Sequence, residues 1–537
     1  MAKPSPAQNA APAGRDWKRI AASAGTGALL TLSFPRTGAS FLAWAALVPL
    51  LLSLSGQGAK KGFFLGLVAG LAHFLSLLYW VVIVLSTYGG LAWPVAVLAA
   101  VLLSAYLALY VGAFSAAFAK TSEKSPVLAA ALAPVFWVAA EYARAHLLTG
   151  FPWSLLGYSQ GPHPLLIQSA DMGGVYVVSF LAVMVNAAVA LGVQALWRPG
   201  GAKAPKKAAA GLLLAAVTLV GADMAYGRMR LSWVDEAIAG AESIRVSVLQ
   251  GNVDQAVKWD PAYQDRTMEI YAALACRAGG QDPDLVVWPE TALPFYFGWD
   301  RTRSNAVRRA AREADAFFLV GSPGFELANG ENRQYNSAFL LSPDGSTTGR
   351  YDKVHLVPFG EYVPLQKILF FLDKLVAQAG DFSRGREGSV LAAGKADLGV
   401  LICYEVIFPG LAKSAVQNGA NLLVTITNDA WFGQSSAPYQ HFSMAAFRAV
   451  ENRRSLVRAA NTGISGFVDP AGRVLGKTPI FVADARTRAV PLLAESTIYS
   501  ARGDVFALAC TALALASLLV LFRPAGPWYT FGRNKAR

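Results

Sequence analysis

The chain has 537 residues, of which 54% are hydrophobic and only 15% are charged, and its mean hydropathy is +0.38. Soluble domains carry about 25% charged residues, so this composition argues against an ordinary cytosolic enzyme and excludes disorder for most of the chain. The net charge is +13, and many of the Lys and Arg residues lie in short clusters between apolar runs. This distribution is typical of a membrane protein, so no nucleic-acid partner is expected.

Apolar stretches dominate the first part of the chain. Residues 1–16 are rich in Ala and Pro and are expected to form a disordered tail. Seven apolar stretches follow in residues 17–226 and one more in 505–522. A helix needs about 20 apolar residues to cross a membrane, so the sequence predicts about eight spans, with 523–537 as a cytoplasmic tail. The stretches are Ile20–Phe34, Ser40–Leu54, Gly62–Ser86, Tyr88–Ala119, Pro126–Leu148, Gly174–Trp197, Ala208–Tyr226 and Val505–Phe522.

The first two stretches are short and flank Pro35, so a shallow hairpin is an alternative to two full spans. Lys and Arg cluster before this pair and again after it, at Lys60 and Lys61; further clusters follow each later pair, at Lys120 and Lys124 and in the segment 198–207. The intervening loops carry little positive charge. Because basic loops stay in the cytoplasm, both termini are predicted to be cytoplasmic.

Residues 227–504 are then placed on the outer face, and they alternate strand-like and helical runs as α/β domains do. About 280 residues are enough to bury an independent core. Predicted strands are Ile244–Leu249, Leu285–Trp288, Phe317–Gly321, Ser337–Leu341, Leu398–Ile402, Leu422–Thr427 and Leu456–Ala459. Predicted helices are Ala262–Ala278, Arg301–Ala314, Pro409–Asn418 and Ala437–Asn452.

Two further segments suit a membrane surface. Gly150–Met172 is too broken for a span and rich in aromatic residues, so we interpret it as interfacial; an ordinary packed connection is the alternative. Pro364–Gln378 is amphipathic and predicts either a lid that dips into the membrane surface or a core helix of the outer domain.

Cysteine and histidine are sparse. Cys276, Cys403 and Cys510 have no regular spacing, which excludes a disulfide framework and a zinc ribbon. The five histidines form no paired-ligand motif, and neither a P-loop nor a dinucleotide fingerprint is present. No metal and no cofactor is therefore expected.

Three motifs place a reactive side chain at or near the end of an apolar run: WPET with Glu290, YDKVHLVPFGEYVP with Lys353, and CYE with Cys403. A base, an ammonium and a thiol together suffice for acyl transfer. Each residue alone has a plainer interpretation. A cysteine at a strand end is usually a small buried hydrophobe, a Glu after a strand is usually a turn or cap residue, and a loop lysine is usually solvated. The coincidence of the three motifs in one domain favours a catalytic site.

These motifs resemble the Glu–Lys–Cys pattern of the nitrilase superfamily, whose domains are αββα sandwiches. Together with the predicted spans, the chain resembles the apolipoprotein N-acyltransferase family from about Trp17 to Phe522. The resemblance implies that Glu290 is the general base, Lys353 the oxyanion and electrostatic partner, and Cys403 the nucleophile. It also implies supporting roles for four residues, which are Trp259, Glu361, Tyr404 and Glu405.

The family's activity, carried over to this chain, is a ping-pong reaction. Cys403 takes an acyl group from the sn-1 ester of a phospholipid, and the free α-amine of a diacylglyceryl-cysteine in an apolipoprotein then takes it from the thioester. A cation beside the thiol is also expected to lower its pKa. The implied location is the bacterial inner membrane, with the catalytic domain on the periplasmic side, and a monomer is expected.

Two other functions remain open on the residues alone. A membrane-tethered amidase or nitrilase would use the same three groups on a small amide or nitrile, with water as the acceptor, but such a substrate does not need a membrane. A transporter or scaffold whose outer domain only binds is the other alternative, although ionisable residues within the predicted spans are few, with Glu141 and Arg144 the main candidates.

Overall fold

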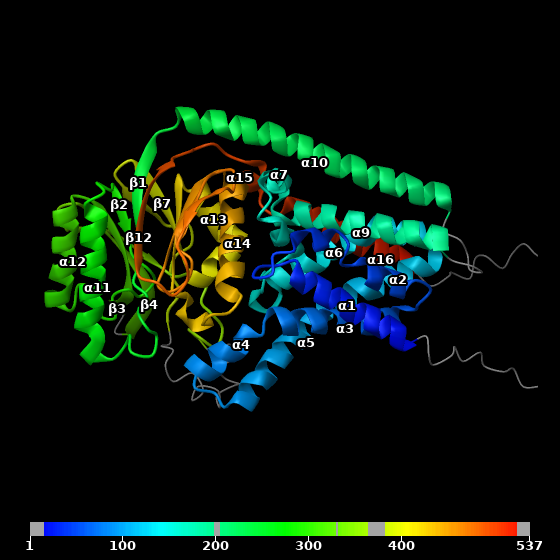
Figure 1. Cartoon of the computed structure of the whole chain (residues 1–537), viewed down its shortest axis with the longest axis horizontal. Helices are drawn as coiled ribbons and strands as arrows, with labels where there is room; N and C mark the ends of the chain where they lie inside the picture. Colours follow the sequence, from blue (N-terminus) through cyan, green and yellow to red (C-terminus); the bar gives the residue numbers. More distant parts are fainter. Residues whose placement is uncertain (1–15, 198–204, 329–330, 363–381, 523–537) are drawn as a thin grey trace, which may run out of the picture.

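The computed structural model describes residues 16–197, 205–328, 331–362 and 382–522, and all structural statements concern these residues. The two predicted tails and Pro364–Gln378 lie outside them, apart from Asp16 at the end of the first tail. The described chain has a helical region at one end and an α/β domain at the other (Figure 1). A membrane-spanning helical region joined to an αββα sandwich, the fold class predicted from the sequence, is confirmed.

The helical region contains apolar helices joined by short helical turns. Its elements are α1 (Asp16–Leu32), η2 (Ser40–Trp44), α2 (Val48–Leu54), α3 (Ala59–Leu77), α4 (Trp80–Ile83), η3 (Val84–Tyr88), α5 (Trp93–Lys124), α6 (Pro126–His146), η4 (Leu147–Thr149), η5 (Leu156–Gln160), α7 (Pro164–Ile167), α8 (Ala170–Gly173), α9 (Val175–Trp197), α10 (Lys206–Gly240) and α16 (Val505–Phe522).

Five of the eight predicted spans meet the length and hydropathy of a membrane-crossing helix in the described part of the chain: α3, α5, α6 with η4, α9 and α10. The other three are shorter or less apolar; α1, for instance, has 17 residues, and a break at residues 33–39 separates it from η2 and α2. The first pair of stretches therefore forms a short helical hairpin.

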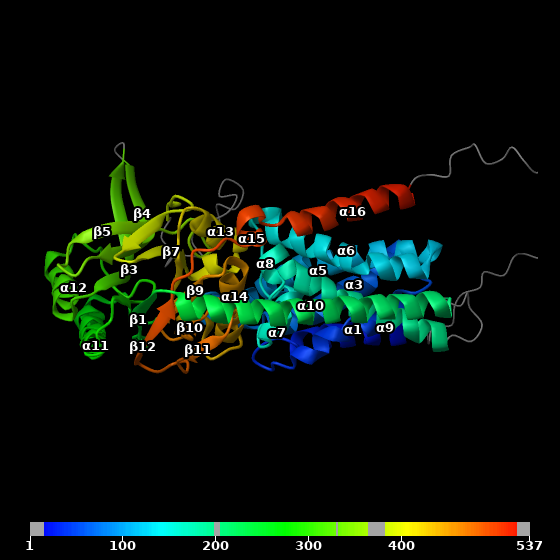
Figure 2. The ribbon, with the colours of Figure 1, turned by 90° about the horizontal axis from the view of Figure 1, so that it is seen from above.

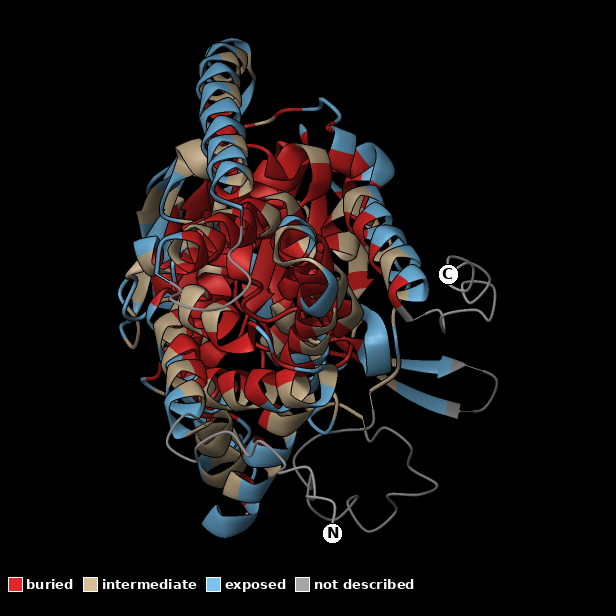
Figure 3. Cartoon of the chain, turned by 90° about the vertical axis from the view of Figure 1, so that its right-hand side faces the viewer, coloured by how far each residue is buried: buried red, intermediate tan, exposed pale blue. Residues whose placement is uncertain are grey.

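The outer surface of the helical region is apolar. Buried residues fill its middle, while the peripheral helices, above all α10, turn many exposed residues outward (Figure 3). Exposed apolar surface on this scale is costly in water and favourable in lipid, so these helices belong in a membrane. The side chains exposed by more than half include Leu98, Leu102, Leu214, Val217, Leu515 and Leu519.

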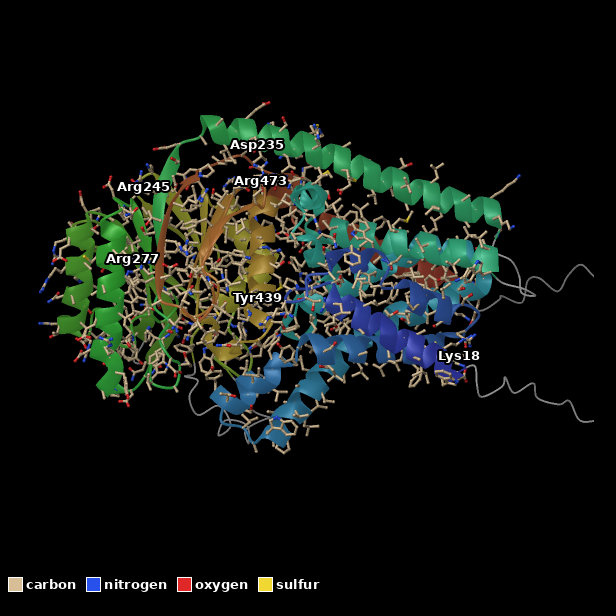
Figure 4. All side chains as sticks on the ribbon, in the orientation of Figure 1. Lys18, Asp235, Arg245, Arg277, Tyr439 and Arg473 are labelled. Carbon is tan, nitrogen blue, oxygen red and sulfur yellow. The ribbon has the colours of Figure 1, made fainter. Side chains whose placement is uncertain are left out.

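The α10 helix links the two regions. Its 35 residues extend about 52 Å, whereas the hydrocarbon core is about 30 Å thick. The helix continues to Gly240, so the predicted domain boundary at residue 227 falls inside it. Near its end, Asp235 Oδ2 accepts a hydrogen bond from Arg473 Nη2 of the α/β domain at 3.0 Å (Figure 4). The helix thus carries the chain from the membrane to the first strand.

The α/β domain contains two six-stranded sheets, in the orders β12-β1-β2-β3-β4-β5 and β11-β10-β9-β8-β7-β6. In each sheet the central strands, β1 to β3 and β7 to β9, run parallel. The strands are β1 (Ser243–Gln250), β2 (Leu285–Val287), β3 (Phe317–Ala328), β4 (Glu331–Leu341), β5 (Thr347–Asp352), β6 (Val390–Ala393), β7 (Ala396–Ile402), β8 (Leu422–Thr427), β9 (Ser455–Ala460), β10 (Gly466–Val468), β11 (Val474–Lys477) and β12 (Asp484–Pro491).

Helices cover the outer face of each sheet (Figures 1 and 2). α11 (Pro261–Gly279) and α12 (Arg301–Ala314) cover the first sheet, and α13 (Pro409–Gln417) and α14 (Ala437–Asn452) cover the second. The remaining short helix is α15 (Ile498–Arg502). One hydrophobic core lies between the sheets, and the residues of α13 and α14 share another with the membrane helices. The second sheet is therefore the one nearest the membrane.

The segment 150–172 packs between the helical region and α14. Trp153 and Tyr158 are 1% exposed, and the Trp153 Nε1–H donates to Gln440 Oε1 of α14 at 2.8 Å. On the other side of the segment, the Leu156 N–H donates to Glu141 Oε1 of α6 at 2.7 Å. Of the two interpretations, this geometry favours the packed connection, which joins the two regions into one body.

Candidate active site

The three predicted motifs meet where strands of the two sheets end. Glu290 comes shortly after β2 and Lys353 directly after β5, both in the first sheet. Cys403 directly follows β7 of the second sheet, as the first residue of η7 (Cys403–Ile407). The charges of Glu290 and Lys353 both act on the pKa of the Cys403 thiol. The fold thus brings a carboxylate, an ammonium and a thiol from two sheets into one site.

Lys353 is shared by two carboxylates. Its Nζ lies 2.9 Å from Glu361 Oε1 and 3.6 Å from Glu290 Oε1, and its side chain is 1% exposed. Burial works to lower the pKa of Lys353, but the charges of Glu361 and Glu290 outweigh it and raise the pKa above its ordinary value. Lys353 is therefore a fixed positive charge inside the site.

Asn336 of β4 holds both carboxylates through one amide nitrogen. Its Nδ2 donates to Glu290 Oε1 at 2.7 Å and to Glu361 Oε1 at 2.9 Å. The second oxygen of each carboxylate accepts a backbone N–H, from Asn428 for Glu290 and from Val357 for Glu361, each at 2.8 Å. With a donor at every oxygen, both side chains are held in orientation as hydrogen-bond acceptors.

Cys403 has a left-handed backbone, with φ of 54°, a conformation that costs a non-glycine residue of order 1 kcal/mol or more. Burial and the charge of Glu290 raise the pKa of its thiol, and the lowering by Lys353 is smaller. Lys353 therefore lowers the thiol pKa as predicted, but burial outweighs it, so the thiol pKa as a whole is raised. The resting thiol keeps its proton, so nucleophilic attack requires a base, and Glu290 is the carboxylate at hand.

Glu405 connects the two sides of the site. It is fully buried and accepts hydrogen bonds from the Tyr351 hydroxyl at 3.0 Å and from the backbone N–H groups of Val354, His355 and Ile402 at 2.6 to 3.0 Å. Burial raises the pKa of Glu405 to about 7, and the backbone donors oppose the rise. The carboxylate ties the loop after β5 to the end of β7, so it fixes the spacing between the ammonium and the thiol.

Tyr404 and Trp259 lie at the margin of the site. The Tyr404 ring centre is 5.1 Å from that of Phe408 and 6.5 Å from that of Phe151 in the connecting segment, so it faces the helical region. Trp259 is 46% exposed, on the turn that precedes α11. A half-exposed indole beside a buried site is suited to contact a substrate, whereas Tyr404 packs against aromatic neighbours.

The residue before Trp259 was missed by the sequence analysis. Lys258 is 1% exposed, and its Nζ donates to Thr291 Oγ1 at 2.7 Å and to the Glu290 carbonyl at 3.3 Å. Burial lowers the pKa of Lys258 to about 7, against the opposite effect of the charges of Glu290 and Cys403. Lys258 thus holds the loop that carries the candidate base. No pattern in the sequence distinguishes it from a solvated lysine.

Replacing Lys258 by methionine is expected to change how stability depends on pH. The pKa is about 7 in the folded chain and about 10.4 when unfolded, so between these values the unfolded state binds the extra proton and stability rises with pH. We expect the Tm of the wild type, measured in detergent, to rise relative to that of Lys258→Met between pH 7 and pH 9.5. The corresponding difference in the free energy of unfolding should grow by at most about 1.4 kcal/mol per pH unit. The exposed Lys477→Met serves as the control, and an equally flat difference for both variants would contradict the assignment.

Two stretches of the chain match known families. Residues 26–188 match the family model of the apolipoprotein N-acyltransferase N-terminal domain, and residues 245–505 match that of carbon-nitrogen hydrolases. The second match covers all three candidate catalytic residues.

Relatives match over most of their length. The apolipoprotein N-acyltransferase of Geobacter metallireducens is 46% identical over 500 residues, which cover 93% of this chain and 94% of the relative. That of Allorhizobium ampelinum is 36% identical, with 85% and 87% covered. Among solved structures, the amidase of Nesterenkonia sp. AN1 is 22% identical, with a TM-score of 0.36, and the match covers 49% of this chain and 98% of the amidase.

Proposed function

The chain belongs to the apolipoprotein N-acyltransferase family and is a membrane-embedded acyltransferase with a nitrilase-like domain, and from this premise we propose that Cys403 carries the acyl group as a thioester. Glu290 is the general base, and Lys353 stabilises the oxyanion. The donor is a phospholipid, and the acceptor is the N-terminal amine of a diacylglyceryl-cysteine in an apolipoprotein.

In the first half-reaction Cys403 Sγ attacks the ester carbonyl carbon, and its proton passes to Glu290. The negative charge that develops on the carbonyl oxygen is stabilised by Lys353. The C–O bond then breaks, and the departing alkoxide takes the proton from Glu290 to leave as a lysophospholipid. The raised pKa of the thiol supports this order, because the proton must be removed during the attack.

In the second half-reaction the neutral α-amine attacks the thioester carbonyl, and Glu290 takes a proton from the nitrogen. The C–S bond breaks, the amide forms, and the Cys403 sulfur recovers the proton. Glu290 acts as base in both halves, which suits a carboxylate held at both oxygens, by Asn336 and by the Asn428 N–H. The single observation that carries the proposal is this cluster of Glu290, Lys353 and Glu361 beside the thiol.

The distribution of basic residues supports an outer location for the catalytic domain. Lys18 lies at the end of the helical region that is farthest from the α/β domain (Figure 4). Lys61, which pairs with Asp16, and Lys124, which donates to the Leu521 carbonyl, belong to the same end. If this end is cytoplasmic, the α/β domain lies on the periplasmic side of the inner membrane, where the outer leaflet supplies phospholipid. We propose that the protein acts there as a monomer.

Mass spectrometry of the purified protein after mixing with phospholipid tests the proposal. We expect a fatty-acyl mass on the Cys403 peptide that hydroxylamine removes and that a diacylglyceryl peptide with a free α-amine discharges. Cys276, which is exposed, and Cys510, which lies in α16, are internal controls and should stay unmodified. An unmodified Cys403 in folded protein would refute the phospholipid donor. Discharge by water at the same rate with and without the amine would favour the amidase alternative.

A further inference from the structure

A histidine that the mechanism does not use contacts the backbone of the nucleophile. His441 of α14 is fully buried, and its Nε2 lies 3.1 Å from the carbonyl oxygen of Cys403. A carbonyl oxygen can only accept a hydrogen bond, so Nε2 must carry the hydrogen. The contact is made to a residue whose left-handed backbone, with φ of 54°, is unfavourable for any residue but glycine.

A buried ion pair orients the other ring nitrogen. Arg458 Nη2 lies 2.9 Å from Asp429 Oδ2 and 2.9 Å from His441 Nδ1, and all three side chains are fully buried. Nδ1 also lies 3.1 Å from Asp429 Oδ1. A neutral ring whose Nε2 carries the hydrogen has none at Nδ1, so Nδ1 accepts from the Arg458 guanidinium, which can only donate. Burial and the charge of Arg458 also lower the pKa of His441, which keeps the ring neutral. Asp429 is held in turn by the Thr427 hydroxyl at 2.9 Å.

The ring also lies against the membrane side of the protein. Trp153 of the connecting segment stacks on His441, with ring centres 5.5 Å apart and planes 25° from parallel. The preceding residue, Gln440, accepts the indole N–H of Trp153 at 2.8 Å and that of Trp80 in α4 at 3.3 Å. His441 is thus fixed from the domain side by Arg458 and from the connecting segment by Trp153, while Trp80 holds the neighbouring Gln440.

We propose that His441 is a positioning residue for the nucleophile, which holds the Cys403 carbonyl through Nε2–H and thereby sets the direction of the thiol. This inference rests on the proposed role of Cys403. His441 is buried, so it does not touch substrate, and it can act only by fixing the backbone of Cys403. Because Trp153 packs on the ring, the alignment of the thiol also depends on how the connecting segment docks against α14.

Two amide substitutions separate the functions of the two ring nitrogens. In His441→Gln the terminal amide reaches the place of Nε2 and can donate to the Cys403 carbonyl. In His441→Asn the shorter side chain can accept from Arg458 but cannot reach that carbonyl. We expect the rate of Cys403 acylation by phospholipid to fall about ten- to a hundredfold in His441→Asn and to stay within about threefold of the wild type in His441→Gln. The KM for phospholipid should be unchanged in both variants.

The control is Val307→Ala, a change to a buried residue of α12 that packs in the core on the outer face of the first sheet. It should lower stability and leave the acylation rate as it is. Equal rates in the Asn and Gln variants would overturn the inference, whether both match the wild type or both fall. A wild type without acylation would instead refute the role of Cys403 itself.

A measurement on the wild type does not depend on how the variants fold. Nitrogen NMR of ¹⁵N-histidine-labelled protein, with the His441 signals assigned by their loss in His441→Gln, reports the tautomer directly. The Nε2–H tautomer at neutral pH is expected. The Nδ1–H tautomer would place an acceptor against the Cys403 carbonyl and would overturn the inference.

Discussion

Replacing Cys403 by serine is expected to lower acyl transfer by about 10⁴-fold or more, which corresponds to about 5.5 kcal/mol of transition-state free energy. A hydroxyl loses its proton less readily than a thiol, so Glu290 is too weak a base to activate it in the same way. Any oxyester that formed would also resist the amine acceptor. Release of lysophospholipid and amide formation, followed separately, should both disappear, and activity within tenfold of the wild type would refute the thioester route.

Two other substitutions at the same position control for folding. Cys403→Ala removes the sulfur and should leave the Tm within a few degrees of the wild type, because the side chain is only partly buried and the methyl group fits. Cys403→Gly should be more stable than Cys403→Ala by about 1 kcal/mol in the free energy of unfolding, since glycine adopts the φ of 54° without strain. A Gly variant that is less stable than the Ala variant would show that the backbone there is not strained.

Much of the outer domain could be predicted from local patterns. α12 and α14 occupy the predicted ranges, because their apolar residues recur at helical spacing and turn residues bound them. β2, β7 and β8 also lie where continuous apolar runs predict buried parallel strands. Since α/β folds present polar groups at the ends of such strands, Glu290 and Cys403 could be located from the same runs.

The rest of the fold depends on tertiary contacts that no local pattern reports. β12 has few apolar residues and forms only by pairing with β1. In this pairing Ser247 lies opposite Thr487, 240 residues further along the chain. The last part of α10, from residue 227 to Gly240, is rich in polar residues. Its composition is like that of the outer domain, so the sequence does not indicate where the helix ends. Both errors come from elements that partner residues stabilise and whose own hydrophobic pattern is weak.

The supporting residues of the site show the same limit. Asn336 lies in an ordinary strand, Lys258 in a turn and His441 in a helix, and each acquires its place through contacts with distant residues. Sequence reasoning weighed histidine as a metal ligand and not as a hydrogen-bond donor to the nucleophile's backbone. Motif spacing indicated the reacting groups, whereas the groups that hold them could be found only by folding the chain.

Burial determines how each charged group in the site must be compensated. Lys258 and Lys353 are both buried, yet only Lys353 lies between two carboxylates, and only Lys353 has a raised pKa. Removal of that cation leaves Glu290 and Glu361 as like charges in a buried site, joined through the Asn336 amide. Lys353 therefore has a structural role beside the catalytic role that we propose for it, and a double variant separates them.

Lys353→Met is expected to destabilise the protein by about 3–5 kcal/mol, because it breaks a buried ion pair, and to slow Cys403 acylation by about 10²- to 10³-fold, because the oxyanion loses its cation. Adding Glu361→Gln removes one of the two unpaired charges, so the double variant should recover most of the lost Tm in detergent. Its acylation rate should stay low, since Lys353 acts on the transition state directly and the neutral amide introduced by the second substitution does not replace the ammonium.

The thiol gives an independent measure of the same cation. Lys353 lowers the pKa of Cys403 against the larger effect of burial, so both variants should react more slowly than the wild type with iodoacetamide at a given pH. Recovery of stability together with acylation in the double variant would show that Lys353 only neutralises Glu361. If Lys353 acts on both the thiol and the oxyanion, the double variant should recover stability alone, while its acylation and its alkylation both stay slow.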